Sequence, residues 1–266
     1  MNRRSFLKSS ATALTVTGLA TGLTGAAAEG ATAREFYELR RYQFRFGPMA
    51  KRFEQYITQA AMPAMQRMGI GPIGVFSPAG GPDNPAAYVL VPFKSLAEFA
   101  SVGERLQQDP EYQKLGDDYI NTPATDPPYV RYESSLLLAL TGMPRLAVPA
   151  QTADNRSRLF ELRTYESHSR KALKTKVKMF NEGELDIFRR TGLAPVFFGE
   201  TLIGPQQPNL TYLLVFDDLA HHGQCWEKFR NDPEWEKMSA TPGYSNAEIV
   251  SNIHSLFLKP MGCSQL

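Results

Sequence analysis

Two related heptapeptides decide the fold of this sequence: Phe36-Tyr37-Glu38-Leu39-Arg40-Arg41-Tyr42 and Leu159-Phe160-Glu161-Leu162-Arg163-Thr164-Tyr165. They share the core Glu-Leu-Arg-x-Tyr and lie 123 residues apart, since Glu38 corresponds to Glu161. The same offset relates Asp109-Pro110-Glu111-Tyr112 to Asp232-Pro233-Glu234-Trp235. Several matches at one offset indicate an internal duplication, which has to be recognised before any fold is assigned.

The duplication predicts the domain organisation. We expect a first repeat over residues 35–140 and a second over residues 158–260. Residues 141–157 lie between them and are rich in proline, alanine and small polar residues. This composition is typical of a linker.

Each repeat has the pattern of a β-α-β-β-α-β unit. The alternating segment 36–44 is typical of a strand, and residues 49–68 have helical spacing with a kink expected at Pro63. The further elements expected in the first repeat are strands at 70–76, 86–93 and 129–140, a helix at 96–107 and a short helix after Asp109. Asp109 and Asp232 each precede Pro and Glu, as helix N-caps do.

A four-stranded ferredoxin-like sheet buries one face under its helices and leaves an apolar face to be covered. Two such sheets in one chain can cover each other. We therefore predict an α+β fold in which two tandem ferredoxin-like repeats form an intramolecular dimeric α/β barrel. Two independent ferredoxin-like domains are the alternative.

The first residues have the pattern of an export signal. Asn2-Arg3-Arg4-Ser5-Phe6-Leu7-Lys8 precedes an uncharged stretch and two small-residue cleavage sites, Ala26-Ala27-Ala28 and Ala31-Thr32-Ala33. The arginine pair resembles a bacterial twin-arginine signal, so we expect residues 1–33 to be removed and the protein to be periplasmic or otherwise extracytoplasmic. The stretch is diluted with threonine and glycine, which argues against a membrane span.

Charge excludes several partners. The whole chain has a formal charge of +2, but residues 34–266 hold 26 basic and 26 acidic side chains. A neutral chain argues against nucleic-acid binding, which needs a basic face, and against electrostatic attachment to anionic membranes. Further homo-oligomerisation stays open.

The motifs resemble one known family. The opening heptapeptide, Met62-Pro63-Ala64, Gly69-Ile70 and Asp109-Pro110-Glu111 are similar to the NIPSNAP family, and so is the second heptapeptide. The second repeat departs from the first, because Asp186 stands where the first has Pro63. The resemblance implies the dimeric α/β-barrel fold. It implies little about activity, since related barrels include cofactor-free monooxygenases, isomerases and haem proteins.

The heptapeptides also supply the candidate site residues. Side chains alternate along a strand, so three residues of each heptapeptide share a face with one another: Glu38, Arg40 and Tyr42, and Glu161, Arg163 and Tyr165. We expect these six to point into the barrel, with Tyr37, Leu39, Phe160 and Leu162 beneath the helices. There they would surround a small ligand, an arginine binding an anionic group and a glutamate accepting a proton. The alternative is a buried Glu–Arg ion pair in each repeat that fixes sheet register.

Other candidate residues lie in the second half of the chain. His254, in the expected strand 249–258, is a candidate haem ligand or proton carrier; the alternative is a hydrogen-bonded structural residue. We expect His168 in a loop and His221 and His222 on the solvent side of a helix. We expect three aromatic residues in the core: Trp226, Phe229 and Trp235. Cys225 and Cys263 leave open both a disulfide and two free thiols, and no cysteine–histidine cluster has metal-ligand spacing.

The sequence leaves three functions open and requires no cofactor. The first is a barrel that binds a small molecule or serves as a scaffold. The second is a cofactor-free monooxygenase or isomerase that acts in the barrel. The third is a haem protein with His254 as ligand.

Overall fold

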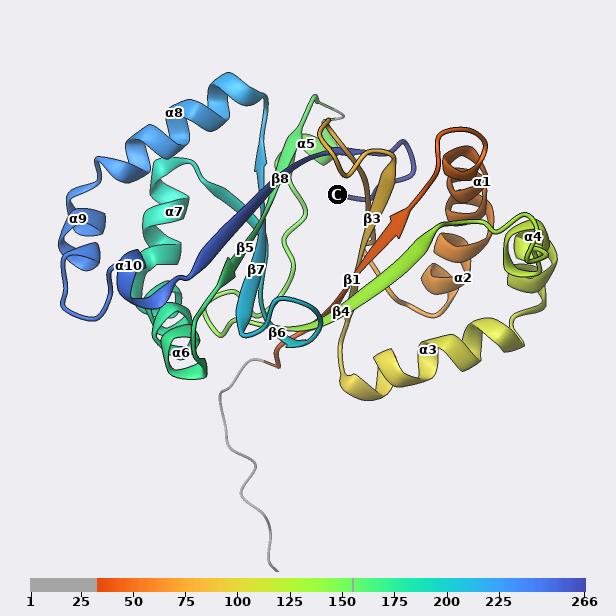
Figure 1. Cartoon of the computed structure of the whole chain (residues 1–266), viewed down its shortest axis with the longest axis horizontal. Helices are drawn as coiled ribbons and strands as arrows, with labels where there is room; N and C mark the ends of the chain where they lie inside the picture. The colour runs from red at the N-terminus through yellow and green to blue at the C-terminus, as the bar shows by residue number, and fades with distance from the viewer. Residues whose placement is uncertain (1–32, 155) are drawn as a thin grey trace, which may run out of the picture. The chain divides into compact units, whose positions relative to one another are not determined.

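The computed structural model describes residues 33–154 and 156–266. Their eight strands form a closed antiparallel barrel in the order β1-β3-β2-β8-β5-β7-β6-β4 (Figure 1). Residues 1–32 hold almost all of the predicted export signal, which therefore lies outside the described residues. No helix in the described part of the chain is long and apolar enough to cross a bilayer.

The predicted fold is confirmed, although the strands expected to begin at residues 70 and 249 begin at Gly74 and Asn252, the latter because a helical turn takes up residues 246–249. The strands are β1 (Phe36–Gln43), β2 (Gly74–Pro78), β3 (Ala86–Phe93), β4 (Arg131–Ala139), β5 (Leu159–Glu166), β6 (Ala194–Ile203), β7 (Asn209–Phe216) and β8 (Asn252–Pro260). Each repeat forms a four-stranded sheet, and two pairings between the repeats close the barrel. One joins β2 to β8, with Phe76 opposite Pro260, and the other joins β4 to β6, with Ala139 opposite Gly199.

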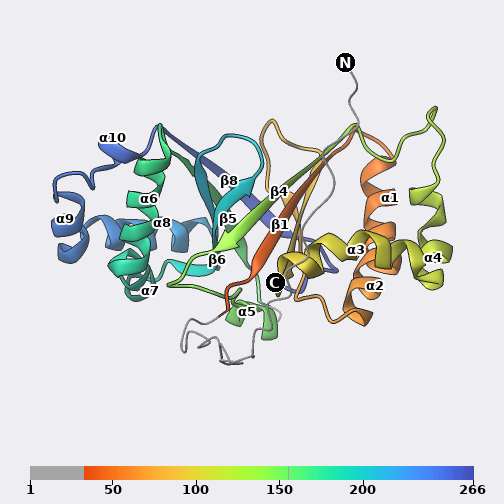
Figure 2. The ribbon, with the colours of Figure 1, turned by 90° about the horizontal axis from the view of Figure 1, so that it is seen from below.

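The helices cover the outside of the barrel. Those of the first repeat are α1 (Met49–Tyr56), η1 (Ile57–Ala61, a π-helical turn), α2 (Met62–Arg67), α3 (Leu96–Gln108) and α4 (Pro110–Ile120). Between the repeats lies α5 (Ala150–Ala153), followed in the second repeat by α6 (Arg170–Met179), η2 (Phe180–Glu184, π-helical), α7 (Leu185–Thr191), α8 (Leu219–Arg230), α9 (Pro233–Ser239) and α10 (Asn246–Ile249). The two sets of helices lie on opposite sides of the barrel (Figures 1 and 2).

The distortion expected at Pro63 is a π-helical turn. η1 ends two residues before Pro63, whose missing N–H cannot complete an ordinary helical ladder. The second repeat has the equivalent turn, η2, although Asp186 takes the place of Pro63. The π-helical turn is therefore a property of both repeats and does not depend on the proline alone.

Both Asp-Pro-Glu motifs cap helices, as predicted. The carboxylate of Asp109 accepts a hydrogen bond from the backbone N–H of Tyr112 at 2.8 Å, at the start of α4. The same carboxylate forms an ion pair with Arg67 at 2.8 Å, which ties α2 to α4. Asp232 repeats the arrangement with Arg190 at 2.6 Å. These residues therefore join helices in both repeats.

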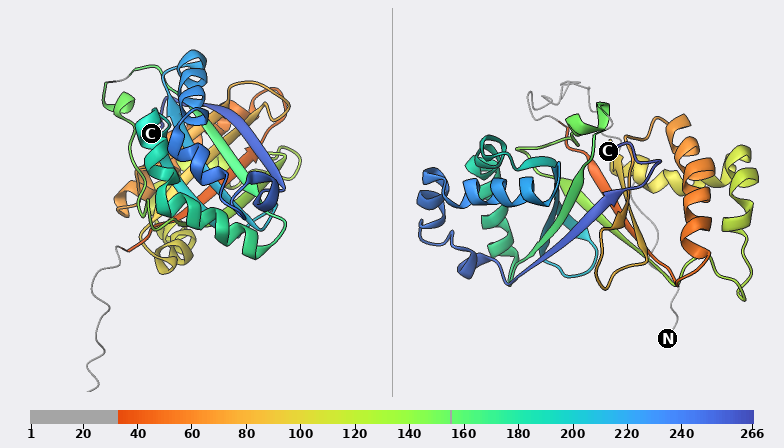
Figure 3. Two further views of the ribbon diagram at one scale, coloured as in Figure 1. Left: turned by 90° about the vertical axis from the view of Figure 1, so that its left-hand side faces the viewer. Right: turned by 90° about the horizontal axis from the view of Figure 1, so that it is seen from above.

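Side chains from both repeats fill most of the barrel interior. The largest of them form two aromatic contacts: the rings of Tyr37 and Phe197 lie 5.1 Å apart, and those of Phe76 and Phe160 lie 4.8 Å apart. Leu266 is fully buried in the same cluster. Outside it, α6, α7 and α8 cross the strands of the second repeat (Figure 3, left). The barrel is thus largely a packed core.

Replacing Asp109 by Ala removes both the cap of α4 and the ion pair with Arg67. We expect the free energy of unfolding to fall, because the first turn of α4 loses the acceptor for its backbone N–H and α2 loses its ionic link to α4. Urea denaturation measures the change. Asp118→Ala, at an exposed position of the same helix, is the control and should leave the free energy of unfolding nearly unchanged. An equal loss in both variants would contradict the capping role.

Candidate functional site

The structure corrects the predicted orientation of the six heptapeptide residues. Glu38, Arg40 and Tyr42 face the helices: Tyr42 packs with Phe53 of α1 at 4.8 Å between ring centres. Glu161, Arg163 and Tyr165 likewise lie beneath the helices of the second repeat. The residues expected beneath the helices line the barrel instead, namely Tyr37, Leu39, Phe160 and Leu162. The six candidates therefore lie outside the barrel cavity.

In the first repeat, both carboxylate oxygens of Glu38 have hydrogen-bond partners. Its carboxylate lies 2.7 Å from Nη2 of Arg40 and accepts hydrogen bonds from the hydroxyls of Ser134 at 2.8 Å and Tyr132 at 3.1 Å. Burial alone would raise the pKa of Glu38, but Arg40 and the two hydroxyls outweigh it and hold the pKa below its usual value. The pair is thus the buried ion pair that the sequence offered as the alternative.

Glu161 forms a larger network in the second repeat. It binds Nη1 of Arg163 at 2.6 Å, the Ser255 hydroxyl at 2.6 Å and the indole N–H of Trp226 at 2.9 Å. Burial opposes ionisation, yet Arg163 and these donors lower the pKa of Glu161. His222 lies 3.1 Å from the same carboxylate, so its predicted position on the solvent side of α8 is wrong. The contact with Glu161 therefore turns the imidazole of His222 toward the sheet, beside the indole of Trp226.

Two further predictions are confirmed. His168 is exposed in a loop. Trp226 and Phe229 are buried in the core between the sheet and the helices of the second repeat, and Trp235 packs against this core. Cys225 and Cys263 are free thiols. The described residues hold no cluster of histidine, cysteine, aspartate or glutamate that could bind a metal.

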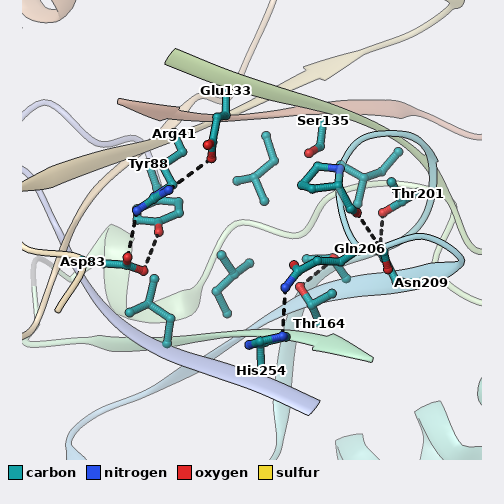
Figure 4. A pocket seen from close by; sticks show the side chains of 16 residues that line it. Arg41, Asp83, Tyr88, Glu133, Ser135, Thr164, Thr201, Gln206, Asn209 and His254 are labelled. Atoms are coloured by element: carbon teal, nitrogen blue, oxygen red, sulfur yellow. Dashed lines mark hydrogen bonds and ion pairs between the residues drawn. The ribbon is translucent and has the colours of Figure 1, made fainter. Parts of the chain in front are cut away.

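A cavity of about 280 Å³ opens at one end of the barrel, and we call it the barrel-mouth cavity (Figure 4). Four leucines supply its apolar lining: Leu39, Leu137, Leu162 and Leu256. Its polar lining comes from both repeats. Two loops that correspond in the duplication, β2–β3 and β6–β7, contribute Asp83 and Gln206.

The wall from the first repeat is charged. Arg41 of β1 forms ion pairs with Asp83 at 2.8 Å and with Glu133 of β4 at 3.1 Å. The phenol of Tyr88 donates to Asp83 at 3.1 Å, and burial raises the pKa of Tyr88, which keeps the phenol protonated. Two carboxylates therefore face one guanidinium, and this wall has a net negative charge.

The wall from the second repeat carries hydroxyls, amides and one imidazole. Hydroxyl and amide side chains pair along it, Thr164 with Thr211 at 2.9 Å and Thr201 with Asn209 at 2.6 Å. Nε2 of His254 lies 2.7 Å from Glu166 and 2.8 Å from the amide of Gln206. Gln206 is the one non-glycine residue with positive φ (58°) in the described chain, and strained backbone of this kind is concentrated at functional sites.

The two walls correspond in the duplication but differ in chemistry. At the offset of 123 residues, Arg41 corresponds to Thr164, Asp83 to Gln206 and Tyr88 to Thr211. Sequence reasoning missed these residues because it followed what the repeats share. The signal that could have found them is the opposite one, a polar position where the aligned repeats differ.

A haem does not fit the barrel-mouth cavity. Its volume of about 280 Å³ lies just below the range of about 300–1,000 Å³ that is usual for small-molecule sites, and aromatic side chains fill the barrel behind it. The His254 side chain is half exposed, and its Nε2 already contacts Glu166. An axial ligand needs a ring nitrogen directed at a pocket that holds the macrocycle.

Comparison with known families agrees with this duplicated architecture. The NIPSNAP family model matches residues 37–122 and 160–265, one match in each repeat. The chain belongs to the NIPSNAP family. The predicted resemblance is thereby confirmed. No curated protein matches the sequence.

Solved structures share the fold of this NIPSNAP protein. A Lactobacillus acidophilus protein provisionally described as a monooxygenase has a TM-score of 0.54 at 8% identity, over 85% of this chain and 94% of its own. A Fusobacterium nucleatum protein described in the same way has a TM-score of 0.54 at 7% identity, over 86% and 93%. An uncharacterised NIPSNAP-like domain protein from Burkholderia xenovorans is 19% identical over 40% of this chain and 88% of its own, with a TM-score of 0.36. At their identities, the likeness to the Lactobacillus and Fusobacterium proteins shows the fold alone.

Replacing Arg40 by Met leaves the buried carboxylate of Glu38 without its counter-charge. We expect a loss of about 3–5 kcal/mol in the free energy of unfolding, the usual cost of breaking a buried ion pair. Arg189→Met removes an exposed pair with Asp186 and should cost about 1 kcal/mol or less. Urea denaturation distinguishes the two. An Arg40 variant as stable as the Arg189 variant would show that the pair does not stabilise the fold.

The lowered pKa of Glu38 predicts a pH dependence. A carboxylate whose pKa is lower in the folded state stabilises it above the ordinary glutamate pKa of about 4.3, and this contribution is lost as pH falls through the folded-state pKa. In a plot of unfolding free energy against pH, Glu38→Gln should therefore flatten the fall at acid pH. Glu236→Gln, at an exposed position, is the control, and its curve should run parallel to that of the unmodified chain. Parallel curves for both variants would refute the assignment.

Proposed function

We propose that this NIPSNAP protein binds a small amphipathic amine in the barrel-mouth cavity. The observation that carries the proposal is the contrast between the two walls. The repeats keep their ion pairs, caps and π-helical turns in common but present different polar groups to this one cavity. Export by the twin-arginine route belongs to the same proposal.

The charge of the cavity selects the head group of the ligand. Arg41 is already neutralised, because both Asp83 and Glu133 lie within 3.1 Å of it. The remaining negative charge favours an ammonium group and disfavours a carboxylate or phosphate. The anionic ligand expected from the sequence therefore has no free guanidinium to bind in this cavity.

The leucines select the rest of the ligand. Leu39, Leu137, Leu162 and Leu256 give the cavity an apolar lining beside its polar walls. Burying a methylene group is worth about 0.8 kcal/mol, so a short alkyl chain adds useful affinity. A cavity of about 280 Å³ limits that chain to a few carbon atoms.

The residues that the sequence suggested for an enzyme do not lie in the barrel. Glu38 and Glu161 are paired with arginines and face the helices, so neither carboxylate is available as a base in the barrel. The monooxygenase descriptions of the two structural neighbours concern those proteins, whose likeness to this chain is one of fold. Small-molecule binding is therefore the function that the barrel-mouth cavity supports best.

Calorimetric titration of residues 34–266 with butylamine and with butyrate tests the proposal. We expect butylamine to bind more tightly than butyrate, and Glu133→Gln to weaken butylamine binding tenfold or more, because a hydrogen bond to a charged group contributes about 1.5–3 kcal/mol. Glu236→Gln should bind butylamine like the unmodified chain. Equal affinity for both compounds, no binding of butylamine, or an unaffected Glu133 variant would overturn the proposal.

A further inference from the structure

A second departure from the duplication lies beneath the helices of the second repeat. Lys176 of α6 and Glu184 of η2 correspond to Phe53 and Ala61 in the first repeat. In the first repeat both residues are buried in an apolar cluster. In the second, two charged residues occupy the same places and are equally buried. The first repeat therefore shows that the fold forms without this pair of charges.

The two charges form an isolated buried ion pair. Nζ of Lys176 lies 2.9 Å from each carboxylate oxygen of Glu184, and the side chains are 1% and 2% exposed. Three aromatic rings surround the ammonium, at 4.7 Å for Phe180 and 5.4 Å for Tyr165 and Trp235. Glu184 accepts hydrogen bonds from Lys176 alone among the described residues, so its oxygens keep acceptor capacity.

Such a pair contributes little to stability. Desolvation of two charges usually offsets their attraction, and an apolar pair of similar volume is often as stable or more stable. Burial also raises the pKa of Glu184 despite the ammonium beside it. Buried carboxyls with perturbed pKa values are concentrated at functional sites.

Glu184 is among the residues that line a cleft of about 440 Å³, which we call the helix-side cleft. Its walls come from β5, α8 and α9 and include Tyr165, Trp226 and Trp235. Arg163 and Arg230 also line it; Arg163 is paired with Glu161, whereas Arg230 has no ion-pair partner among the described residues. The cleft is thus aromatic, with one buried acceptor and an excess of positive charge.

In the first repeat, three tyrosines of the corresponding helices contact one another. The rings of Tyr56 and Tyr119 stack at 4.0 Å, and the hydroxyl of Tyr56 lies 2.8 Å from that of Tyr112. The phenol rings of these tyrosines thus pack together between the helices of the first repeat. The second repeat presents aromatic walls and an acceptor without phenols at the same positions, since Met179 and Trp235 correspond to Tyr56 and Tyr112.

We propose that the helix-side cleft is a second ligand site, which binds a planar aromatic molecule bearing a hydroxyl group. The ring packs against Trp226 and Trp235, and the hydroxyl donates its hydrogen bond to the carboxylate of Glu184. Lys176 holds that carboxylate in place, and the surplus positive charge of the cleft favours the partial negative charge on the phenol oxygen. This site is independent of the barrel-mouth cavity and of the amine proposed there.

Tryptophan fluorescence reports directly on this cleft, because Trp226 and Trp235 are the only two tryptophans in the sequence. The probes are 4-nitrophenol and nitrobenzene, both titrated at a pH well below the pKa of 4-nitrophenol, so that they differ by one protonated hydroxyl alone. We expect saturable quenching of residues 34–266 by 4-nitrophenol and at least tenfold weaker binding of nitrobenzene. Butylamine at saturation should leave the titration unchanged. Absence of saturable quenching, or equal affinity for the two probes, would overturn the proposal.

The decisive variant reproduces the first repeat. Lys176→Phe combined with Glu184→Ala installs the pair found at Phe53 and Ala61, and should weaken 4-nitrophenol binding at least tenfold while leaving nitrobenzene binding unchanged. The matched control removes an exposed pair of the same helical segment, Lys178→Ala with Glu182→Ala, and should bind like the unmodified chain. Unchanged 4-nitrophenol affinity in the decisive variant would refute the site.

Glu184→Gln provides a test that does not depend on the double variant folding. It keeps the shape of the side chain and removes its charge, and near-ultraviolet circular dichroism checks that the core is intact. We expect the same tenfold loss for 4-nitrophenol. A folded Glu184→Gln variant with full affinity would equally rule out the role of the carboxylate.

Discussion

The rest of the structure depends on one interaction, the buried Glu–Arg pair on the first strand of each repeat. Glu38 and Glu161 each pair with the arginine two residues on and also accept a hydrogen bond from a serine of the adjacent strand, Ser134 or Ser255. A one-residue slip of register would carry both charges of a pair to the opposite face of the sheet and away from the serine that hydrogen-bonds the carboxylate. The pair and its serine together therefore favour the register in which these side chains face the helices.

The duplication separates structural residues from candidate functional ones. What both repeats keep is structural: the Glu–Arg pair, the π-helical turn, and the capping aspartates Asp109 and Asp232 with their arginines. Some of the polar positions that they do not share line two places, the barrel-mouth cavity and the helix-side cleft. Looser packing does not explain why the repeats differ at the helix-side cleft, because Lys176 and Glu184 are as buried as Phe53 and Ala61.

Much of the fold could be predicted from the sequence because its signals are local or repeated. The strand at residues 86–93, the caps at Asp109 and Asp232 and the barrel itself follow from periodicity, capping chemistry and duplication. Strand alternation also placed Glu38, Arg40 and Tyr42 correctly on one face. It could not say which face meets the helices, because β3 and β7 are buried along their whole length and both faces of each sheet are covered.

Comparing the repeats could have pointed to individual residues of the sites, but their assembly in space could not be predicted from the sequence, for a different physical reason. The barrel-mouth cavity joins Asp83 and Gln206 from loops that are far apart in the sequence, and only closure of the barrel brings them together. The helix-side cleft depends on Lys176 and Glu184 approaching across a π-helical turn, whose extra residue per turn shifts the side chains that follow it. His222 moves inward because Glu161 is available as its partner.

The covalent link between the repeats has a genetic consequence. In a barrel made of two identical chains, the symmetry axis applies every substitution twice, so an advantageous change on one wall brings an unwanted copy on the other. A homodimer of the first repeat would set two Arg41–Asp83–Glu133 groups against each other, and a homodimer of the second would have none. Because both repeats lie in one chain, a substitution changes one wall and leaves the other as it was. A single-chain barrel can therefore reach ligand sites that a symmetric homodimer could not encode.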